Sequence, residues 1–282
     1  LKYFLIAARE ENITKAATLL HLTQPTLSRQ LRQLEDELGI TLFYRTSHRI
    51  VLTEDGMLFR RRAQEITDLT EKTKAEFSND AADLAGKISL GCGETYNMGI
   101  LAGWMSVMQK KHPFVTFQVQ SFTADVVLER LENGLLDLGL LIEPVDIRKY
   151  EILRLPLKEK WGILVRQDAK LAGRESIVPE DLEQVPLILP ERLQVQNNLQ
   201  RWFGTSYDRI QTIATYNLLL NAVFMVEKGL GAAVGYEFDR FFPQLKFVPL
   251  VDMPAAGAVL AWKKQQLFSK TVRSFLDICR NG

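Results

Sequence analysis

The chain has 282 residues, of which 46% are hydrophobic and 24% are charged, and its formal net charge is +1. This length is typical of two or three domains, and this composition is typical of a soluble globular protein. So small a net charge provides no general attraction to nucleic acid or to a membrane surface, so any such binding depends on local charge placement.

Cysteine usage and hydropathy exclude several other classes. Cys92 and Cys279 are the only cysteines, and their spacing predicts neither a metal site nor a disulfide framework. Two isolated cysteines suit a reducing compartment. No apolar run approaches the roughly 20 residues that span a bilayer, and the first ten residues are amphipathic rather than secretory. We therefore expect a soluble cytoplasmic protein with no cofactor, no metal and no membrane partner.

Three short helices are predicted at the start of the chain. Phe4, Ala7 and Ala8 lie on one side of a first helix. Thr14 is placed to cap a second helix, whose small residues allow another helix to approach closely. Thr23 is placed to cap a third helix over residues 24–38, with a proline in its first turn, where a missing N–H does no harm.

The third helix combines an apolar stripe with a polar leading edge. The stripe consists of Leu27, Leu31, Leu34 and Leu38 and ends at Gly39, a favoured C-cap residue. Gln and Arg can form paired hydrogen bonds with base edges, while Ser and Thr suit phosphate. The pattern predicts a helix-turn-helix that reads the DNA major groove, and a merely solvated helix face is the alternative. The candidate DNA contacts on this helix are Thr23, Gln24, Pro25, Thr26, Ser28, Arg29 and Arg32.

Residues 42–53 alternate and then turn, which predicts a two-stranded wing. The tip of this wing is expected to present Arg45, Ser47, His48 and Arg49 to the phosphate backbone. Residues 1–62 hold ten Lys and Arg against seven Asp and Glu, a surplus of three. One copy would bind DNA weakly with so small a surplus, whereas a dimer doubles the phosphate contacts.

A long helix is predicted over residues 54–77, with Thr53 as its cap. At 1.5 Å per residue it would reach about 36 Å, which is close to one turn of DNA. A seam at heptad-like spacing favours pairing with the same helix of a second chain, and packing on the core of its own chain is the alternative. The seam consists of Phe59, Ala63, Ile66, Thr70, Thr73 and Phe77.

Residues 16–56, AATLLHLTQPTLSRQLRQLEDELGITLFYRTSHRIVLTEDG, strongly resemble the LysR-type transcriptional regulators. The resemblance implies a winged helix-turn-helix domain, a linker helix, and a two-lobed α/β effector domain similar to type 2 periplasmic binding proteins. It also implies a dimer or a tetramer, built as a dimer of dimers on paired half-sites. The matching positions are Ala16, Ala17, Thr23, Gln24, Pro25, Ser28, Arg29, Leu34, Glu35, Leu38, Gly39, Leu42, Phe43, Arg45, Leu52, Thr53 and Gly56.

The remainder of the chain alternates strands and helices in β-α-β-α-β order, which indicates a parallel sheet. A second α/β unit interrupts the first, and the last helix returns to the first. We expect a DNA-binding domain over 1–53, a linker and dimerisation helix over 54–78, a hinge over 79–86 and an effector-binding domain over 87–282. Within that domain, lobe I is expected over 87–158 and 264–282, and lobe II over 159–263.

Ligands of open α/β sheets bind beyond the carboxyl ends of the strands, beside helix N-termini. The N–H groups there favour a carboxylate or similar anion, which predicts a small anionic effector. Glu94 would repel an anion, and it fits better with a ligand that also carries an amine. The candidate effector contacts are Gly93, Glu94, Thr95, Thr123, Gln194, Gln196, Thr215, Tyr216 and Asn217.

An enzyme is the alternative from another class. The three histidines, His21, His48 and His112, fall in separate elements, and the chain shows no nucleophile motif, no metal spacing and no phosphate loop. Cys92 is interpreted as a packing residue, with redox sensing as the alternative.

We therefore predict a DNA-binding transcriptional regulator of the LysR type, controlled by a small effector, and no enzymatic activity. Its expected partners are double-stranded DNA, the effector and further copies of the chain, with RNA polymerase as another candidate. The remaining alternative is a ligand-independent DNA-binding protein whose C-terminal lobes only oligomerise.

Overall fold

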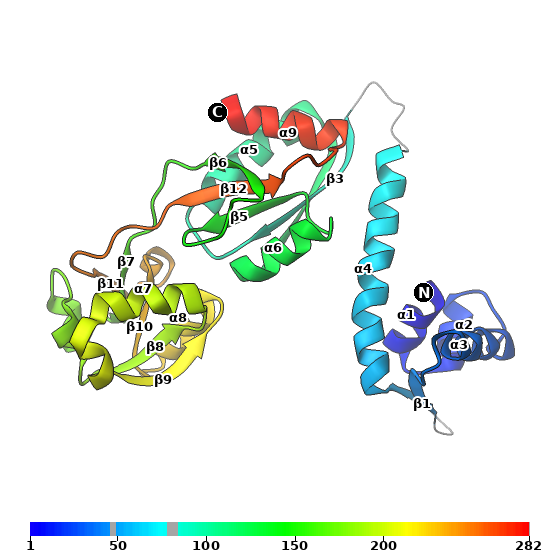
Figure 1. Ribbon diagram of the computed structural model, residues 1–282, viewed down its shortest axis with the longest axis horizontal. Coiled ribbons are helices and arrows are strands. Elements are labelled where there is room, and N and C mark those ends of the chain that lie inside the picture. Colours follow the sequence, from blue (N-terminus) through cyan, green and yellow to red (C-terminus); the bar gives the residue numbers. More distant parts are fainter. Residues whose placement is uncertain (46–48, 78–83, 282) are drawn as a thin grey trace. The chain divides into compact units, whose positions relative to one another are not determined.

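The computed structural model describes residues 1–45, 49–77 and 84–281, and the chain divides into unit 1, residues 1–80, and unit 2, residues 81–282 (Figure 1). Each unit is described by itself. Within the described ranges, no helix is both long enough and apolar enough to cross a membrane.

Unit 1 is the predicted helix-turn-helix with a wing and a long helix. Its core surrounds Phe4, whose ring lies 5.2 Å from that of Phe43 in the wing and 4.9 Å from that of Phe59 in the long helix. These contacts join the helices, the wing and the start of the long helix into one body. The elements are α1 Lys2–Glu10, α2 Ile13–Leu19, α3 Gln24–Leu38, β1 Phe43–Arg45, β2 Ile50–Leu52 and α4 Glu54–Phe77.

The short helices begin and end mostly where predicted. Thr23 caps α3 by accepting a hydrogen bond from the Thr26 amide, and Gly39 ends α3 in the left-handed region at φ 67°. The predicted cap of α2 is wrong, because the side chain of Asn12 accepts from the amide of Lys15 and Thr14 lies inside the helix. The leucine stripe of α3 is only partly buried. Leu27 and Leu31 are in the core, Leu34 is half-buried, and Leu38 is 42% exposed.

Helix α4 divides its predicted seam between two environments. Phe59 and Ala63 pack into the core of unit 1, as the alternative interpretation held. Ile66 is 51% exposed, and the hydroxyls of Thr70 and Thr73 donate to carbonyl oxygens one turn back. The side chain of Phe77 lies outside the described residues. The continuous seam was therefore wrong for the first two turns, which α1 and the wing cover.

Lobe I of unit 2 is a five-stranded sheet in the order β4-β3-β5-β12-β6 (Figure 1). The first three strands are parallel, and β12 is antiparallel to both of its neighbours. Helices α5 and α9 pack on one face of the sheet and α6 on the other. The elements are β3 Ala85–Cys92, α5 Met98–Lys111, β4 Phe114–Ser121, α6 Ala124–Glu132, β5 Leu138–Ile142, β6 Tyr150–Arg154, β12 Ala258–Lys263 and α9 Lys270–Asn281.

Lobe II is a second five-stranded sheet, in the order β11-β7-β10-β8-β9, with α7 on one face and α8 on the other. Short 3₁₀ helices, η1 Lys170–Gly173, η2 Pro179–Leu182, η3 Gly204–Arg209 and η4 Asp239–Phe241, lie in its connections. The main elements are β7 Trp161–Arg166, β8 Pro186–Pro190, α7 Leu193–Phe203, β9 Gln211–Tyr216, α8 Leu219–Glu227, β10 Ala232–Tyr236 and β11 Leu245–Pro249.

The predicted lobe boundary needs one correction. Residues 258–263 were assigned to lobe II, but as β12 they pair with β5 and β6 of lobe I. The first strand of lobe I begins at Ala85 rather than at 87, and most of the expected hinge, residues 79–83, lies outside the described residues. The two-lobed α/β architecture itself is confirmed.

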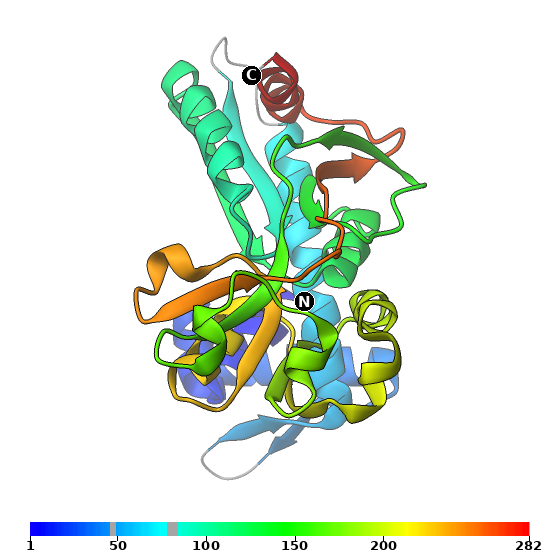
Figure 2. The same cartoon turned by 90° about the vertical axis from the view of Figure 1, so that its left-hand side faces the viewer.

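Two connections pass between the lobes side by side (Figure 2). Glu159 on the first and Ala256 on the second exchange two backbone hydrogen bonds, each 2.9 Å long. The carboxylate of Glu159 also accepts hydrogen bonds from Thr95 and Asn97 of lobe I. This double connection places the carboxyl ends of strands from both lobes against each other.

Candidate functional site

The exposed edge of α3 is the first candidate site, in unit 1. Gln24, Pro25, Thr26, Arg29 and Arg32 are all exposed, as is Thr23 before the helix. Ser28 differs from the prediction because it is half-buried and its hydroxyl accepts from Arg45 at 3.3 Å. The edge therefore presents two guanidinium groups, an amide and hydroxyls on one short helix.

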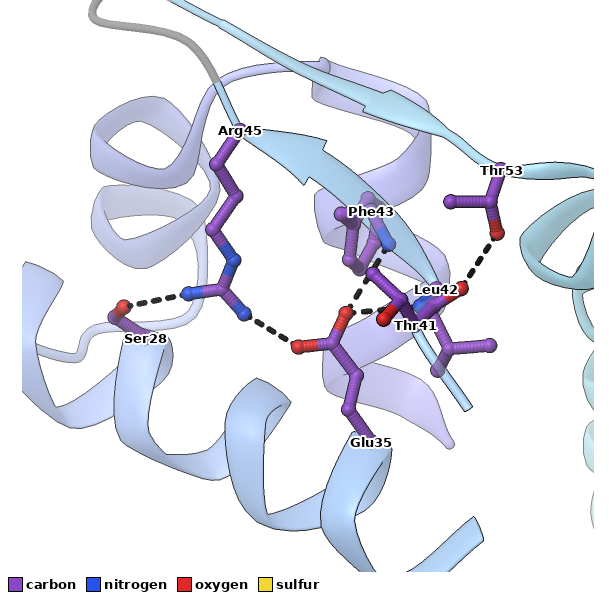
Figure 3. Close-up of polar contacts among 7 residues, drawn as sticks. All are labelled: Ser28, Glu35, Thr41, Leu42, Phe43, Arg45 and Thr53. Atoms are coloured by element: carbon purple, nitrogen blue, oxygen red, sulfur yellow. Dashed lines mark hydrogen bonds and ion pairs between the residues drawn. The ribbon is translucent and has the colours of Figure 1, made fainter. Parts of the chain in front are cut away.

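Arg45 does not lie at the tip of the wing, which corrects the prediction (Figure 3). It ends β1, and its Nη2 donates to Oε2 of Glu35 at 2.7 Å. The other carboxylate oxygen of Glu35 accepts from the amides of Leu42 and Phe43 at 2.9 and 3.1 Å (Figure 3). Glu35 thereby joins the wing to α3, and the charge of Arg45 is paired with the carboxylate of Glu35 rather than directed outward.

The tip of the wing supplies only part of its predicted set. Ser47 and His48 lie outside the described residues, and Arg49, directly after them, is exposed. Contact between the tip and phosphate stays a prediction.

The second candidate site is a cavity of about 450 Å³ between the two lobes of unit 2, called the inter-lobe cavity below. Much of its wall is apolar, and Trp161 and Tyr236 stand in that wall with ring centroids 4.3 Å apart. Both lobes contribute to it, and five predicted residues line it: Gly93, Glu94, Thr123, Tyr216 and Asn217.

Four other predicted residues lie outside the wall of this cavity. Thr95 is buried and its hydroxyl donates to Glu159 beside the crossover. The Gln196 amide donates to the carbonyl oxygen of Pro190 at 3.1 Å. Gln194 and Thr215 are exposed outside the cavity. Gln194 turns away because successive helix residues are about 100° apart, and Thr215 turns away because successive strand residues alternate faces. Their neighbours Leu193, Val195 and Tyr216 face the cavity instead.

The prediction missed the main charged group of the cavity. Arg192 immediately precedes α7, its side chain is 12% exposed, and it lines the wall. Its Nε and Nη2 donate to the carboxylate of Asp125 at 3.0 to 3.2 Å, and its Nη1 donates to the carbonyl oxygen of Pro144. A cation two residues beyond the carboxyl end of β8 was the signal in the sequence that could have identified it.

Glu94 already occupies one of the predicted anion positions. Its Oε2 accepts from the amide of Leu220 in the first turn of α8, at 2.6 Å. Glu94 follows β3 in lobe I, whereas α8 belongs to lobe II, so this bond spans the cavity. A carboxylate is favoured there by the positive end of the helix dipole.

The wall also carries acidic groups that an external ligand would meet. Besides Glu94 and Asp125, it includes the exposed Glu191, so Arg192 is the one cation among the described lining residues. Burial raises the pKa of Tyr236 further above its ordinary value, so this side chain contributes an uncharged aromatic surface to the wall.

Comparison with known proteins matches both units to characterised families. Residues 81–282 match the LysR substrate binding domain, and residues 1–57 match the bacterial regulatory helix-turn-helix protein, lysR family. The HTH-type transcriptional regulator BsdA of Bacillus subtilis is 31% identical, with 99% of this chain and 98% of that protein covered. The Hca operon transcriptional activator HcaR of Escherichia coli is 25% identical, with 99% and 95% covered. CbnR complexed with its target DNA has the same fold, with a TM-score of 0.76 at 21% identity over 99% of this chain and 97% of that one.

The tie through Glu35 gives a first prediction. Glu35→Ala leaves two backbone amides and a guanidinium without their acceptor, so unit 1 should lose about 2 kcal/mol of stability. Glu37→Ala is the matched control, because Glu37 is exposed on the same helix and accepts from the exposed side chain of Gln33 rather than from backbone amides, so it should cost under about 0.5 kcal/mol. Hydrogen exchange of the Leu42 and Phe43 amides measures the effect, and equal exchange in both variants would contradict the role of Glu35.

The cysteines give a second prediction. Cys92 and Cys279 are 4% and 3% exposed, burial raises the pKa of both thiols, and the charge of Glu94 raises that of Cys92 further. Both should react with a thiol reagent at pH 8 at least about 100-fold more slowly than in the unfolded chain. A folded pKa above the unfolded value stabilises the fold below about pH 8.5, and this contribution is lost as the pH rises further. Rapid labelling of native Cys92 would instead support redox sensing.

Proposed function

The chain belongs to the LysR family of DNA-binding transcriptional regulators, and we propose that α3 reads the DNA major groove while the inter-lobe cavity binds a small anionic effector. The single observation that carries the effector part is a cavity of about 450 Å³ that side chains leave unfilled between the lobes. The alternative of lobes that only oligomerise gives no reason for such a cavity. The family and the relatives are transcriptional regulators and not enzymes.

The proposal for DNA rests on the exposed edge of α3. Arg29 and Arg32 are one turn apart, and Gln24 stands at the exposed start of the helix. A guanidinium can donate two hydrogen bonds to one base edge, and an amide can donate one and accept one, so both can distinguish bases, whereas a contact with phosphate cannot. The hydroxyls of Thr23 and Thr26, only 2.8 Å apart, suit a phosphate at the groove edge. Arg45 is left out of this set because Glu35 and Ser28 hold it.

The proposal for self-association rests on α4. Leu58, Ile66 and Leu69 are 60%, 51% and 42% exposed, and their spacing places them along one face of the helix. A second copy of α4 is the surface that would cover this face while adding a second reading helix. A dimer or tetramer also compensates for the surplus of only three cationic residues over residues 1–62. Contact with RNA polymerase stays a prediction from the sequence.

The proposal for an anionic effector rests on Arg192. The cavity is large enough for a molecule of about ten to fifteen heavy atoms, and its walls bury an apolar body against Trp161 and Tyr236. Arg192 is the group that orients one anionic end, since a planar guanidinium pairs with a carboxylate through two parallel hydrogen bonds. The exposed Glu191 can additionally accept from an amine, which retains the amine-bearing ligand as a variant of this proposal.

Arg29→Ala should weaken DNA binding by about ten- to 100-fold, because one paired contact with a base is worth about 1–3 kcal/mol. Genome-wide DNA capture with the full chain measures this, and the discrete sites found with the unaltered chain should vanish. Arg273→Ala, an exposed arginine on α9, is the control and should retain them. If the two variants enrich the same sites equally, Arg29 does not read bases.

Arg192→Gln should weaken binding of an anionic effector by at least about tenfold, because the amide cannot neutralise the bound charge. A thermal-shift screen of small carboxylates against their neutral amides, followed by calorimetry, supplies the ligands. Arg201→Gln, on α7 but outside the inter-lobe cavity, is the matched control and should bind like the unaltered chain. Preference for the amides over the carboxylates would contradict an anionic effector.

A further inference from the structure

We infer that Asp125 and Glu94 are the chain's own occupants of two anion positions in the inter-lobe cavity, and that the effector is therefore a monocarboxylate with an apolar body. In this inference the ligand replaces Asp125 on Arg192, whereas Glu94 stays in place and excludes a second anionic group. It rests on the proposed function of the cavity and adds the charge class of the ligand.

The pair of Arg192 and Asp125 is unequal in its exposure to water. The side chain of Arg192 is 12% exposed and that of Asp125 is 55% exposed. A guanidinium so nearly buried needs an anionic partner, because an unpaired charge there is strongly destabilising. Asp125 is so exposed that water can take over its solvation when it leaves. The cavity therefore requires a carboxylate on Arg192 but does not require that it be this one.

Release of Asp125 is inexpensive for a second reason. Asp125 lies in the first turn of α6, where the positive end of the helix dipole favours a carboxylate whether or not Arg192 is near. Because the Asp125 end of the pair is 55% exposed, water screens the pair and solvates the carboxylate that leaves, so displacement should reduce the affinity of a ligand by no more than about fivefold. An incoming carboxylate keeps the charge pairing of Arg192 and adds the burial of its apolar body against Trp161.

Glu94 differs from Asp125 in what holds it. Its partner is the amide of Leu220, one of the N–H groups that the first turn of α8 leaves without an intrahelical acceptor. Glu94 is half-buried and crosses from lobe I to lobe II to reach this amide. A second carboxylate of a ligand would meet this fixed charge within the same cavity. Repulsion at about 5 Å weakens binding by roughly tenfold or more at the effective dielectric of a partly buried site.

The test uses three molecules with one scaffold: 4-methylbenzoate, the neutral 4-methylbenzamide, and terephthalate, in which a carboxylate replaces the methyl group. Calorimetry on the full chain should show that 4-methylbenzoate binds more tightly than 4-methylbenzamide. Terephthalate should bind at least about tenfold more weakly than 4-methylbenzoate. Asp125→Asn should tighten 4-methylbenzoate by about three- to fivefold and leave 4-methylbenzamide unchanged.

Glu94→Gln should reduce the discrimination against terephthalate by about tenfold, since the amide oxygen still accepts from Leu220 but carries no charge. Asp168→Asn is the matched control, because Asp168 is also an exposed partner of an arginine, Arg166, but lies outside the cavity. It should change none of these affinities. An unaltered thermal unfolding transition of unit 2 shows that each variant is folded, and Asp125→Ser must give the same direction as Asp125→Asn.

The outcomes separate the inference from the proposed function. If 4-methylbenzoate binds but Asp125→Asn and Asp125→Ser leave it unchanged or weaker, Asp125 does not compete and the inference fails while the anionic site stands. Terephthalate binding as tightly as 4-methylbenzoate overturns the role of Glu94 in the same way. If neither carboxylate binds the unaltered chain or any variant, or if the amide binds best throughout, the proposed anionic effector fails together with the inference.

Discussion

A nearly buried guanidinium must have an anionic partner, and in unit 2 this requirement falls on Arg192. Arg192 is the second residue after β8, at the edge where ligands of α/β sheets bind, so its charge faces the inter-lobe cavity. Its partners Asp125 and Pro144 belong to the other lobe. Pairing this charge therefore also joins the lobes, and whatever replaces Asp125 inherits that position.

The two connections between the lobes are tied by hydrogen bonds to the turn that follows Glu94. Glu159 and Ala256 pair the two connecting segments by their backbones, and Glu159 also anchors the turn that contains Thr95 and Asn97. Glu94 immediately precedes this turn and reaches α8 from it. Hydrogen bonds thus link the two connections to the turn after β3, and Glu94 links that turn to the first turn of α8, whereas Arg192 with Asp125 and Pro144 forms a second contact between the lobes.

Local signals in the sequence predicted unit 1 well, because caps and periodicity act over a few residues. Thr23 and Gly39 bound α3 as expected, and Thr53 accepts from the Gly56 amide at the start of α4. Signals that depend on distant partners failed. Pairing of β12 with β5 is set by strands far apart in the chain, and the covering of Ala63 by the core of unit 1 cannot be read from α4 alone. In the cavity, strand ends were predictable, but the phase of α7 turns Leu193 and Val195 toward the cavity and Gln194 away from it.

Both units use a carboxylate to satisfy groups from a second element, yet the two carboxylates differ in whether they can be exchanged. Glu35 and Arg45 are 12% and 26% exposed, and Glu35 also accepts hydrogen bonds from the backbone amides of Leu42 and Phe43. Removing it leaves several polar groups unsatisfied at once, so the tie is structural. Asp125 is 55% exposed and accepts from the guanidinium of Arg192. A carboxylate from solution can accept the same hydrogen bonds equally well. The same chemistry therefore fixes the wing in unit 1 and leaves the inter-lobe cavity of unit 2 open to competition.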